Sequence, residues 1–346
     1  MRKTVIISLI LLLGLTGCNF PLNFASNNQT PLPISDLSGT SDPNALPTPT
    51  PFQPVAPTPD AGGVIPVAGA TTTPISVDPT PEPGTSLGFE LPKSMVNILL
   101  LGSDRRADNS FRTDVIMLLS LDPAKGTAAL TSFPRDLYVS IPGIGMERIN
   151  TSQEFGGFTL TQSTFDFNFG FKPDYYMLTD FSGFSGIVDT LGGIDVNAAY
   201  NLTDVCDLPQ AVNKTCTVYS GINHFNGPTA LWYARSRKST SDFDRTRRAQ
   251  EVISAIFQKL MSLNALNRVP ELYSMFKTSV ETNISLSTIV SLMPLAAKIA
   301  ADPSIVKRYA IGSAQVSNYI VPGSGSQVLL PNQEAVMTIL RQALSQ

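Results

Sequence analysis

The chain is poor in the residues on which many hydrolases and metalloenzymes depend. Its 346 residues include one histidine, one tryptophan and three cysteines, and only 15% of them are charged. Neither an H-E-x-x-H nor a G-x-x-x-x-G-K-[ST] element occurs, which argues against zinc peptidases of that type and against nucleotide-binding P-loops. The single histidine, His224, has no second histidine or acidic cluster to work with, so we interpret it as a loop or helix-entry residue rather than a base.

The charged residues that are present gather in two segments. The first, residues 102–136, carries Asp104 and Asp114 among several arginines. The second places six basic residues within fourteen positions: Arg235, Arg237, Lys238, Arg245, Arg247 and Arg248. The forked guanidinium group favours phosphate, and paired carboxylates favour a hard divalent cation such as Mg²⁺. Together they predict a metal-assisted site for phosphoryl transfer, in which positioning and electrostatics supply the catalysis.

The N-terminus resembles a bacterial lipoprotein signal. Two basic residues precede an apolar run, Val5 to Leu13, and the tetrapeptide LTGC ends at Cys18. The run is shorter than the ~20 apolar residues of a spanning helix, which disfavours the alternative of an uncleaved membrane anchor. We therefore predict a signal peptide over residues 1–18 and lipidation at Cys18, with the rest of the chain anchored at the outer face of the cytoplasmic membrane.

Residues 19–88 form a segment without apolar periodicity. It holds fifteen of the 27 prolines, interspersed with threonine, serine, glycine and alanine. Such a composition cannot bury enough apolar surface to offset the entropy of ordering, so the segment is predicted to be a disordered tether. As polyproline II its ~70 residues would reach up to roughly 200 Å, enough to extend from a membrane into a thick wall.

Two of the three cysteines, Cys206 and Cys216, share one polar loop. If Cys18 carries lipid, an oxidising compartment would let these two pair with each other. The alternative of a thiol nucleophile lacks a histidine partner, because His224 belongs to a different segment. We predict a structural disulfide that stabilises the fold by ~2–3 kcal/mol.

Residues 89–346 fit one large domain. Apolar runs of strand length at 97–101, 115–121 and 127–133 predict buried strands covered on both faces. Shorter strands are predicted at 175–178 and 194–196, and helices at 159–168, 183–191, 247–260, 285–300 and 332–344. Most of the phenylalanines between 155 and 171 are expected in the core. The pattern predicts a single three-layer α-β-α domain with a central mixed sheet.

Seven short motifs occur in order between about Val96 and Leu260: GSDRR, FRTD, SFPRD, RIN, VDTLGGIDV, GPTALWYARSR and DFDRTRR. Each is weak alone, but together they resemble the LytR-CpsA-Psr family of cell-wall glycopolymer ligases. The resemblance implies an α/β domain that binds polyprenyl (pyro)phosphate in a hydrophobic pocket rimmed by arginines. It also implies transfer of a lipid-linked polymer, such as teichoic acid or capsular polysaccharide, to N-acetylmuramic acid of peptidoglycan, with Mg²⁺ as cofactor and release of polyprenyl phosphate.

The resemblance assigns roles to individual residues. Asp104 and Asp114 are the implied metal-linked carboxylates. The implied catalytic residues are Asp104, Arg112, Asp114, Asp242 and Arg245. The implied phosphate-binding residues are Arg106, Arg135, Arg148, Arg235 and Arg237.

Two positions depart from the family's pattern. Arg148 stands where many members have lysine, which replaces a point charge by a fork. Ala249 stands where many members have glutamine, so one phosphate contact is missing unless Gln250 or Arg247 supplies it. We expect these departures to affect substrate affinity or polymer preference more than the class of reaction.

Three functions fit these residues. The first is the transferase described above, and the second is a non-catalytic envelope lipoprotein that binds polyprenyl phosphate or anionic polymer. The third is a polyprenyl pyrophosphatase, in which water replaces the sugar hydroxyl. The paired aspartates and Asp242 favour an enzyme over a binding protein, and no nucleic-acid partner is expected. The sequence does not separate transfer from hydrolysis, and it identifies neither the polymer nor the oligomeric state.

Overall fold

The structure is a computed structural model that describes residues 86–105, 110–264, 267 and 269–346. The predicted signal peptide with Cys18, nearly all of the tether and Arg106 lie outside the described residues, so these predictions stay predictions. Leu87, which the sequence interpretation assigns to the tether, is only 3% exposed and packs in the core of the domain. No helix in the described ranges is long and apolar enough to cross a membrane.

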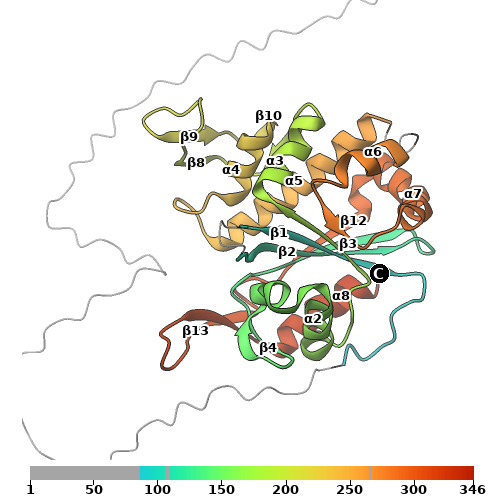
Figure 1. Ribbon diagram of the computed structural model, residues 1–346, viewed down its shortest axis with the longest axis vertical. Coiled ribbons are helices and arrows are strands. Elements are labelled where there is room, and N and C mark those ends of the chain that lie inside the picture. Colours follow the sequence, from blue (N-terminus) through green and yellow to red (C-terminus); the bar gives the residue numbers. More distant parts are fainter. Residues whose placement is uncertain (1–85, 106–109, 265–266, 268) are drawn as a thin grey trace, which may run out of the picture. The chain divides into compact units, whose positions relative to one another are not determined.

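A six-stranded sheet lies at the centre of the domain (Figure 1), in the order β11-β6-β1-β2-β3-β12. Its strands are β1 (Val96–Ser103), β2 (Thr113–Asp122), β3 (Thr127–Phe133), β6 (Tyr175–Asp180), β11 (Glu281–Thr282) and β12 (Val306–Ala310). Strand β1 runs parallel to β6 and antiparallel to β2, whereas β3 runs antiparallel to β2 and parallel to β12. The carboxyl ends of β1, β3 and β6 therefore meet the amino end of β2 at one edge, which we call the carboxyl edge.

Helices cover both faces of the sheet, which confirms the predicted three-layer architecture with a mixed sheet. The lower face in Figure 1 carries α2 (Ser152–Phe169) and α8 (Gln333–Leu344). The upper face carries α3 (Phe181–Thr190), α4 (Gly227–Arg235), α5 (Asp242–Ser262), α6 (Val269–Phe276) and α7 (Leu286–Ala301). Alternate residues of a strand point to opposite faces. Leu99 of β1 accordingly packs in the lower cluster, while its neighbour Ile98 packs in an upper one.

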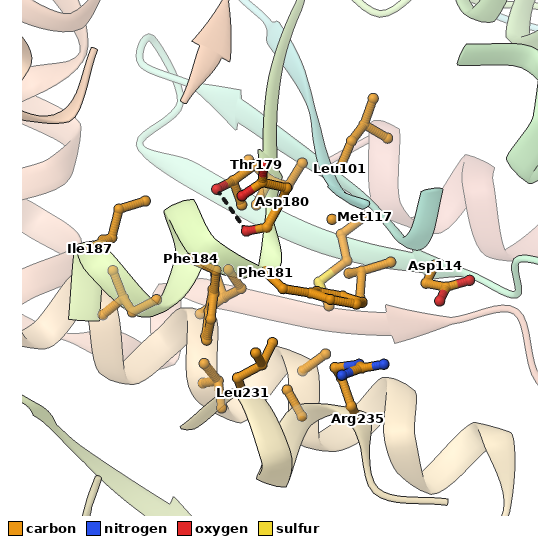
Figure 2. Close-up of a pocket in the computed structure, with 18 of the residues that line it drawn as sticks. Leu101, Asp114, Met117, Thr179, Asp180, Phe181, Phe184, Ile187, Leu231 and Arg235 are labelled. Atoms are coloured by element: carbon orange, nitrogen blue, oxygen red, sulfur yellow. Dashed lines mark hydrogen bonds between the residues drawn. The ribbon is translucent and has the colours of Figure 1, made fainter. Parts of the chain in front are cut away.

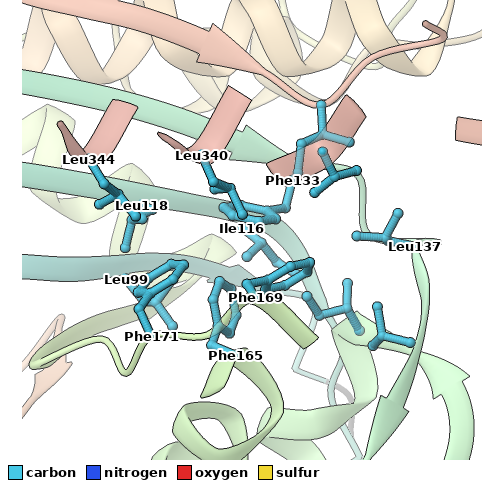
Figure 3. Packing of buried hydrophobic residues seen from close by; sticks show 14 of the residues in the cluster. Leu99, Ile116, Leu118, Phe133, Leu137, Phe165, Phe169, Phe171, Leu340 and Leu344 are labelled. Carbon is cyan, nitrogen blue, oxygen red and sulfur yellow. The ribbon is translucent and has the colours of Figure 1, made fainter. Parts of the chain in front are cut away.

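The lower core is built around an aromatic cluster (Figure 3). Phe133 of β3 lies 5.1 Å from Phe165 and 5.5 Å from Phe169 between ring centroids, and Phe165 lies 5.8 Å from Phe171. Leu340 of α8 is fully buried in the same cluster. These phenylalanines are core residues, as their sequence pattern predicts.

The described residues also form two-stranded pairings and short 3-10 helices outside the central sheet. The pairs are β4 (Tyr138–Ile141) with β5 (Gly145–Arg148), β7 (Ile194–Ala198) with β10 (Gly221–Phe225), β8 (Leu202–Val205) with β9 (Thr215–Val218), and β13 (Val316–Ile320) with β14 (Gln327–Pro331). The 3-10 helices are η1 (Ile149–Thr151) and η3 (Pro303–Ile305). The predicted disulfide is present and joins Cys206 to Cys216 across the end of the β8–β9 hairpin. His224 lies on β10, where its exposed ring is 2.7 Å from Asp195, so the expectation of a loop or helix-entry position is wrong.

Candidate functional site

A cavity of about 320 Å³ opens between the upper face of the sheet and helices α3, α4, α5 and α6. Its lining is mostly apolar and includes Leu100, Met117, Phe184, Ile187, Ile253 and Ile256. Such a surface favours an apolar ligand, because each Å² of apolar surface removed from water contributes ~25 cal/mol. A few convergent polar groups would then fix the orientation of that ligand.

Charged residues of the predicted site gather at one end of this cavity. The lining contains Asp114, Arg135, Arg235, Arg237 and Arg245. Figure 2 shows Asp114 and Arg235 at one end of the cavity and Ile187 at the other. The cavity thus has an apolar end and a cationic end, and the cationic end lies at the carboxyl edge of the sheet.

Asp114 and Arg135 form the central ion pair of the cationic end. Arg135 Nη1 lies 2.8 Å from Asp114 Oδ1, and each side chain is 20% exposed. Burial alone would lower the pKa of Arg135, but the hydrogen bond and charge of Asp114 outweigh it, so the pKa of Arg135 is raised. Arg135 therefore keeps its charge beside Asp114 at neutral pH.

Arg245 lies deeper than the other cations of the site. Its side chain is 8% exposed, and its Nη2 lies 2.9 Å from Asp242 Oδ2 and 3.4 Å from the backbone oxygen of Asp114. Burial lowers the pKa of Arg245 although Asp242 opposes the shift, and the charge of Arg135 lowers it further. A cation that is short of solvent and close to other cations gains strongly from an anion placed beside it.

The start of α5 fixes the position of Arg245. Apolar periodicity places the beginning of this helix at Arg247, but the helix begins at Asp242. The reason is a capping box: the Ser241 hydroxyl accepts from the backbone N–H of Asp244, whose carboxylate accepts from the backbone N–H of Ser241. The extra turn places Asp242 and Arg245 on one helix face, three residues apart.

Buried Arg248 holds the loop between α4 and α5. Its side chain is among the largest fully buried ones, at 1% exposure. Its Nε donates to the backbone oxygen of Tyr233 at 2.9 Å, and its Nη2 donates to the backbone oxygen of Ser236 and to Thr240 Oγ1. Arg248 is therefore part of the framework and not of the cavity lining.

The disulfide hairpin holds the same loop from the other side. Asp204 of β8 is 4% exposed, and its Oδ2 accepts from the backbone N–H of Lys238 at 3.0 Å. The indole N–H of Trp232 donates to the backbone oxygen of Val205 at 2.9 Å. The segment with Arg235 and Arg237 is thus fixed before any ligand arrives, which reduces the entropy that binding must remove.

Arg235 lies over an aromatic ring that also lines the cavity. Its guanidinium carbon lies 3.8 Å from the centroid of the Phe181 ring, the first residue of α3. The guanidinium group of an arginine can stack on an aromatic ring while its N–H groups stay available to an anion. Nothing in the sequence pattern connects these two residues, which are 54 positions apart.

Asp104 lies at the carboxyl edge beside the amino end of β2. Its Oδ1 accepts from the backbone N–H of Arg112 at 2.7 Å, and its own N–H donates to the backbone oxygen of Arg112 at 3.1 Å. Arg112 precedes Asp114 by two residues, so both aspartates belong to one corner of the sheet. Neither Asp104 nor Arg112 lines the cavity itself.

The carboxylates of Asp104 and Asp114 are the predicted ligands of Mg²⁺. Across the described residues there is no cluster of three or more histidine, cysteine, aspartate or glutamate side chains able to hold a metal, so a cage built only from such side chains is not found there. Mg²⁺, however, is usually bound by one or two carboxylates together with substrate phosphates and waters. A site of that kind would take its carboxylates from Asp104 and Asp114, and Mg²⁺ binding there stays a prediction.

Arg148 is not brought to the cavity. Its Nε lies 3.2 Å from Asp136 Oδ1, and its Nη2 donates to the backbone oxygen of Gln327 at 2.9 Å. It joins the SFPRD segment to the β13–β14 hairpin, and its predicted contact with phosphate stays a prediction. Asp242 also lies outside the cavity lining and reaches it only through Arg245.

Ala249, the second departure from the family's pattern, lines the cavity with a small side chain. Ala249 lines the cavity, whereas Gln250 donates to Ser132 Oγ at 2.7 Å and to the backbone oxygen of Tyr309 at 2.9 Å. Arg247 pairs with Glu251 and lies over the ring of Tyr200. Neither Gln250 nor Arg247 lines the cavity, so neither occupies the place of the missing glutamine.

Comparison with known proteins shows the family of the chain. The sequence model of the LytR_cpsA_psr family matches residues 71–339, which is most of the chain. The chain belongs to the LytR-CpsA-Psr family. Among curated family members, it is 32% identical to Regulatory protein MsrR of Staphylococcus aureus over 192 residues, which are 55% of this chain and 56% of MsrR. It thus matches little more than half the length of that relative.

Other members carry names that describe an activity. The chain is 27% identical to the Polyisoprenyl-teichoic acid--peptidoglycan teichoic acid transferase TagT of Bacillus subtilis, over 73% of this chain and 77% of TagT. Among solved structures, B. subtilis TagV aligns with a TM-score of 0.61 and 26% identity, covering 74% of this chain and 99% of TagV. TagT bound to LI-WTA aligns with a TM-score of 0.56 and 25% identity, covering 75% and 94%.

Proposed function

We propose that this LytR-CpsA-Psr protein transfers a glycopolymer from a polyprenyl (pyro)phosphate carrier to N-acetylmuramic acid of peptidoglycan. The observation that carries this proposal is the cavity that is apolar along its length and cationic at one end. A carrier with a long apolar chain and a phosphate head has the same two parts in the same order. The transferase names of TagT and the related TagU support the same reaction class.

The proposed reaction places the prenyl chain between the sheet and α5, with its phosphates among Arg135, Arg235 and Arg245. The acceptor hydroxyl oxygen attacks the phosphorus that carries the polymer, and the bond from that phosphorus to the oxygen of the polyprenyl phosphate breaks. The hydroxyl proton passes to a carboxylate at the carboxyl edge. The products are a phosphodiester between polymer and glycan and a free polyprenyl phosphate.

The arginines stabilise this step because negative charge moves onto the leaving polyprenyl phosphate as its bond breaks. They are already positioned by Asp114, Arg248 and the disulfide hairpin, so little reorganisation accompanies the reaction. Mg²⁺ held by Asp104 and Asp114 would neutralise further charge on the phosphate oxygens. Localisation outside the cytoplasmic membrane, with an anchor at lipidated Cys18, belongs to the same proposal.

The test is an incubation of the protein with a synthetic polyprenyl-pyrophosphate-linked glycan, Mg²⁺ and peptidoglycan fragments, followed by mass spectrometry. The proposal expects the phosphodiester between polymer and muramic acid. Free glycan phosphate in its place would assign the protein as a pyrophosphatase. Tight binding without any product would assign it as a carrier-binding protein.

A further inference from the structure

A second cavity opens at the carboxyl edge, beside the first. It has a volume of about 610 Å³ and lies at the carboxyl end of β6, between α3 and the segment that joins α6 to β11. Thr179, Asp180 and Val280 line both cavities, so these residues form the shared wall. The roles considered above for phosphate, prenyl chain and metal do not involve this second cavity.

The lining of the second cavity is polar and carries charges of both signs. Hydroxyl groups come from side chains such as Thr179, Ser182 and Ser279. The charged side chains of the lining are two basic and two acidic ones: Arg105, Lys277, Asp180 and Glu281. Arg105 Nη2 lies 3.9 Å from Glu281 Oε2, so its charge is partly balanced. A phosphate would favour the arginine cluster next door, and an apolar chain would favour the first cavity. Hydroxyls with balanced charge suit an uncharged ligand rich in hydroxyl and amide groups.

Helix α3 separates the two cavities and presents a different face to each. Phe181, Phe184 and Ile187 line the first cavity (Figure 2), while Ser182 and Gly186 line the second. The two sets alternate at helical spacing. One helix therefore supplies an apolar wall to one ligand and a small, polar wall to another.

The second cavity lies close to the reacting end of the first. In the sheet, Asp180 pairs with Ser103, and Ser103 pairs with Thr113, the residue before Asp114. Neighbouring strands lie about 4.8 Å apart, so two strand spacings, roughly 10 Å, separate β6 from β2 at this edge. The shared wall at Asp180 therefore lies within roughly 10 Å, two strand spacings, of the amino end of β2 that carries Asp114.

The opposite approach along the edge is covered. The backbone N–H of Leu329 in β14 donates to the backbone oxygen of Asp136 at 2.9 Å, and Arg148 bonds to Gln327 of the same strand. The β13–β14 hairpin thus lies against the segment that follows β3. On the β6 side, by contrast, the carboxyl edge carries the polar lining of the second cavity.

We propose that the second cavity binds the acceptor glycan strand, through an uncharged N-acetylated sugar ring next to the ring whose hydroxyl attacks. This inference rests on the proposed transferase function and adds the place where the acceptor is held. It accounts for two cavities of opposite character that share one wall beside the arginines. The carrier fills the apolar cavity while the acceptor fills the polar one.

Gly186 lines the second cavity, so a larger side chain at this position can be used to fill that cavity. A Cβ at Gly186 would meet no heavy atom within 4 Å, whereas a Cβ at Gly183 would lie 2.6 Å from the backbone oxygen of Ser279. Replacing a helical glycine whose surroundings are open does not destabilise the fold, because it reduces the entropy of the unfolded chain. Gly186→Phe therefore blocks the polar cavity without altering the lining of the apolar one.

The experiment compares wild type, Gly186→Phe and the control Thr338→Phe, a substitution at an exposed position of α8. Transfer to a peptidoglycan disaccharide fragment is measured against fragment concentration, together with binding of the polyprenyl-linked donor. We expect Gly186→Phe to raise the KM for the fragment at least tenfold with unchanged donor affinity, and Thr338→Phe to match wild type. Gly186→Leu replaces Gly186→Phe if thermal unfolding shows that the larger side chain disturbs the fold.

Two results would overturn the inference. One is an unchanged KM for the fragment in a folded Gly186→Phe protein. The other is a loss of affinity for the polymer-bearing donor but not for bare polyprenyl phosphate, which would place the donor's own sugars in the cavity. Fragment binding is also followed by NMR without donor. If wild type binds the fragment and Gly186→Phe does not, the inference stands even where no transfer occurs and the transferase function fails.

Discussion

On the lower face of the sheet, twenty buried apolar side chains form one continuous cluster, whereas the buried apolar residues of the upper face divide among three smaller clusters. The cavity of about 320 Å³ lies on the upper face. The strands carry buried apolar side chains on both faces, for example Leu99 on the lower face and Met117 on the upper face. The lower layer therefore stabilises the fold, while the upper layer leaves apolar surface for a ligand to cover.

The largest expected effect is on turnover and belongs to the upper layer. Asp114→Asn keeps the size of the side chain but removes the charge that faces Arg135 and the proposed metal. Turnover of lipid-linked donor should fall about 100- to 1,000-fold, because charge stabilisation at the reacting phosphate is lost. Steady-state kinetics with and without chelator measure this effect.

The matched control is Asp166→Asn, which removes an exposed carboxylate of α2 that pairs with Lys172 at 3.4 Å on the lower layer. It should leave turnover unchanged. Wild-type rates in Asp114→Asn and no response to chelator would contradict metal-assisted catalysis.

A pair of truncations compares the two faces directly. Phe165→Ala removes a fully buried ring of the lower cluster and should cost about 3–5 kcal/mol of unfolding free energy. Phe184→Ala removes a ring that is only partly buried and lines the cavity, so it should cost less stability but weaken polyprenyl phosphate binding. Denaturant unfolding and equilibrium binding give both quantities. Equal losses of unfolding free energy in the two variants would contradict the claim that the lower layer contributes more to stability than the upper layer.

The disulfide hairpin gives a smaller effect. Replacing Cys206 and Cys216 together by serine should lower the unfolding free energy by about 2–3 kcal/mol, because the unfolded chain is no longer closed into a loop. It should also weaken carrier binding, since Asp204 and Val205 would hold the arginine loop less firmly. Thermal unfolding and binding under one set of conditions measure both. A stable double variant with full affinity would show that the hairpin does not position the arginines.

The smallest effect on stability is expected from filling the cavity. Ala234 of α4 lines it, and Ala234→Leu adds apolar atoms where there is room. Stability should change by no more than about 0.5 kcal/mol, while affinity for the prenyl chain falls because the added atoms occupy its place. Calorimetry and a binding titration separate the two. A gain in carrier affinity would mean that the chain lies elsewhere.

The central strands could be predicted because each contains an apolar run, such as ILLL in β1 and VIMLL in β2. Strand β12, the outermost strand beside β3, could not be predicted. Its sequence VKRYA carries two charges, and its side chains are exposed or only partly buried. Apolar periodicity misses the first turn of α5, because the apolar residues begin inside the helix. That first turn is set by the polar capping box of Ser241.

The charged end of the site could be predicted in outline. The ordered sequence motifs identify five charged residues that line one end of the cavity in the structure: Asp114, Arg135, Arg235, Arg237 and Arg245. The cavity itself could not be predicted, because a side chain such as Phe184 or Ile253 that lines a void has the same sequence pattern as one that fills a core. Only the three-dimensional packing distinguishes the two.

The most direct measurement of the central claim is the affinity of polyprenyl phosphate compared with that of the uncharged polyprenol, for wild type and for Arg235→Ala/Arg237→Ala. Charge-assisted hydrogen bonds are each worth about 1.5–3 kcal/mol, so wild type should prefer the phosphate by about 100-fold or more. The double variant should lose most of that preference while keeping the affinity for polyprenol and the unfolding free energy. Equal affinities for both lipids in wild type, or an unchanged preference in the variant, would contradict a cavity that binds a prenyl chain along its length and its phosphate at the arginines.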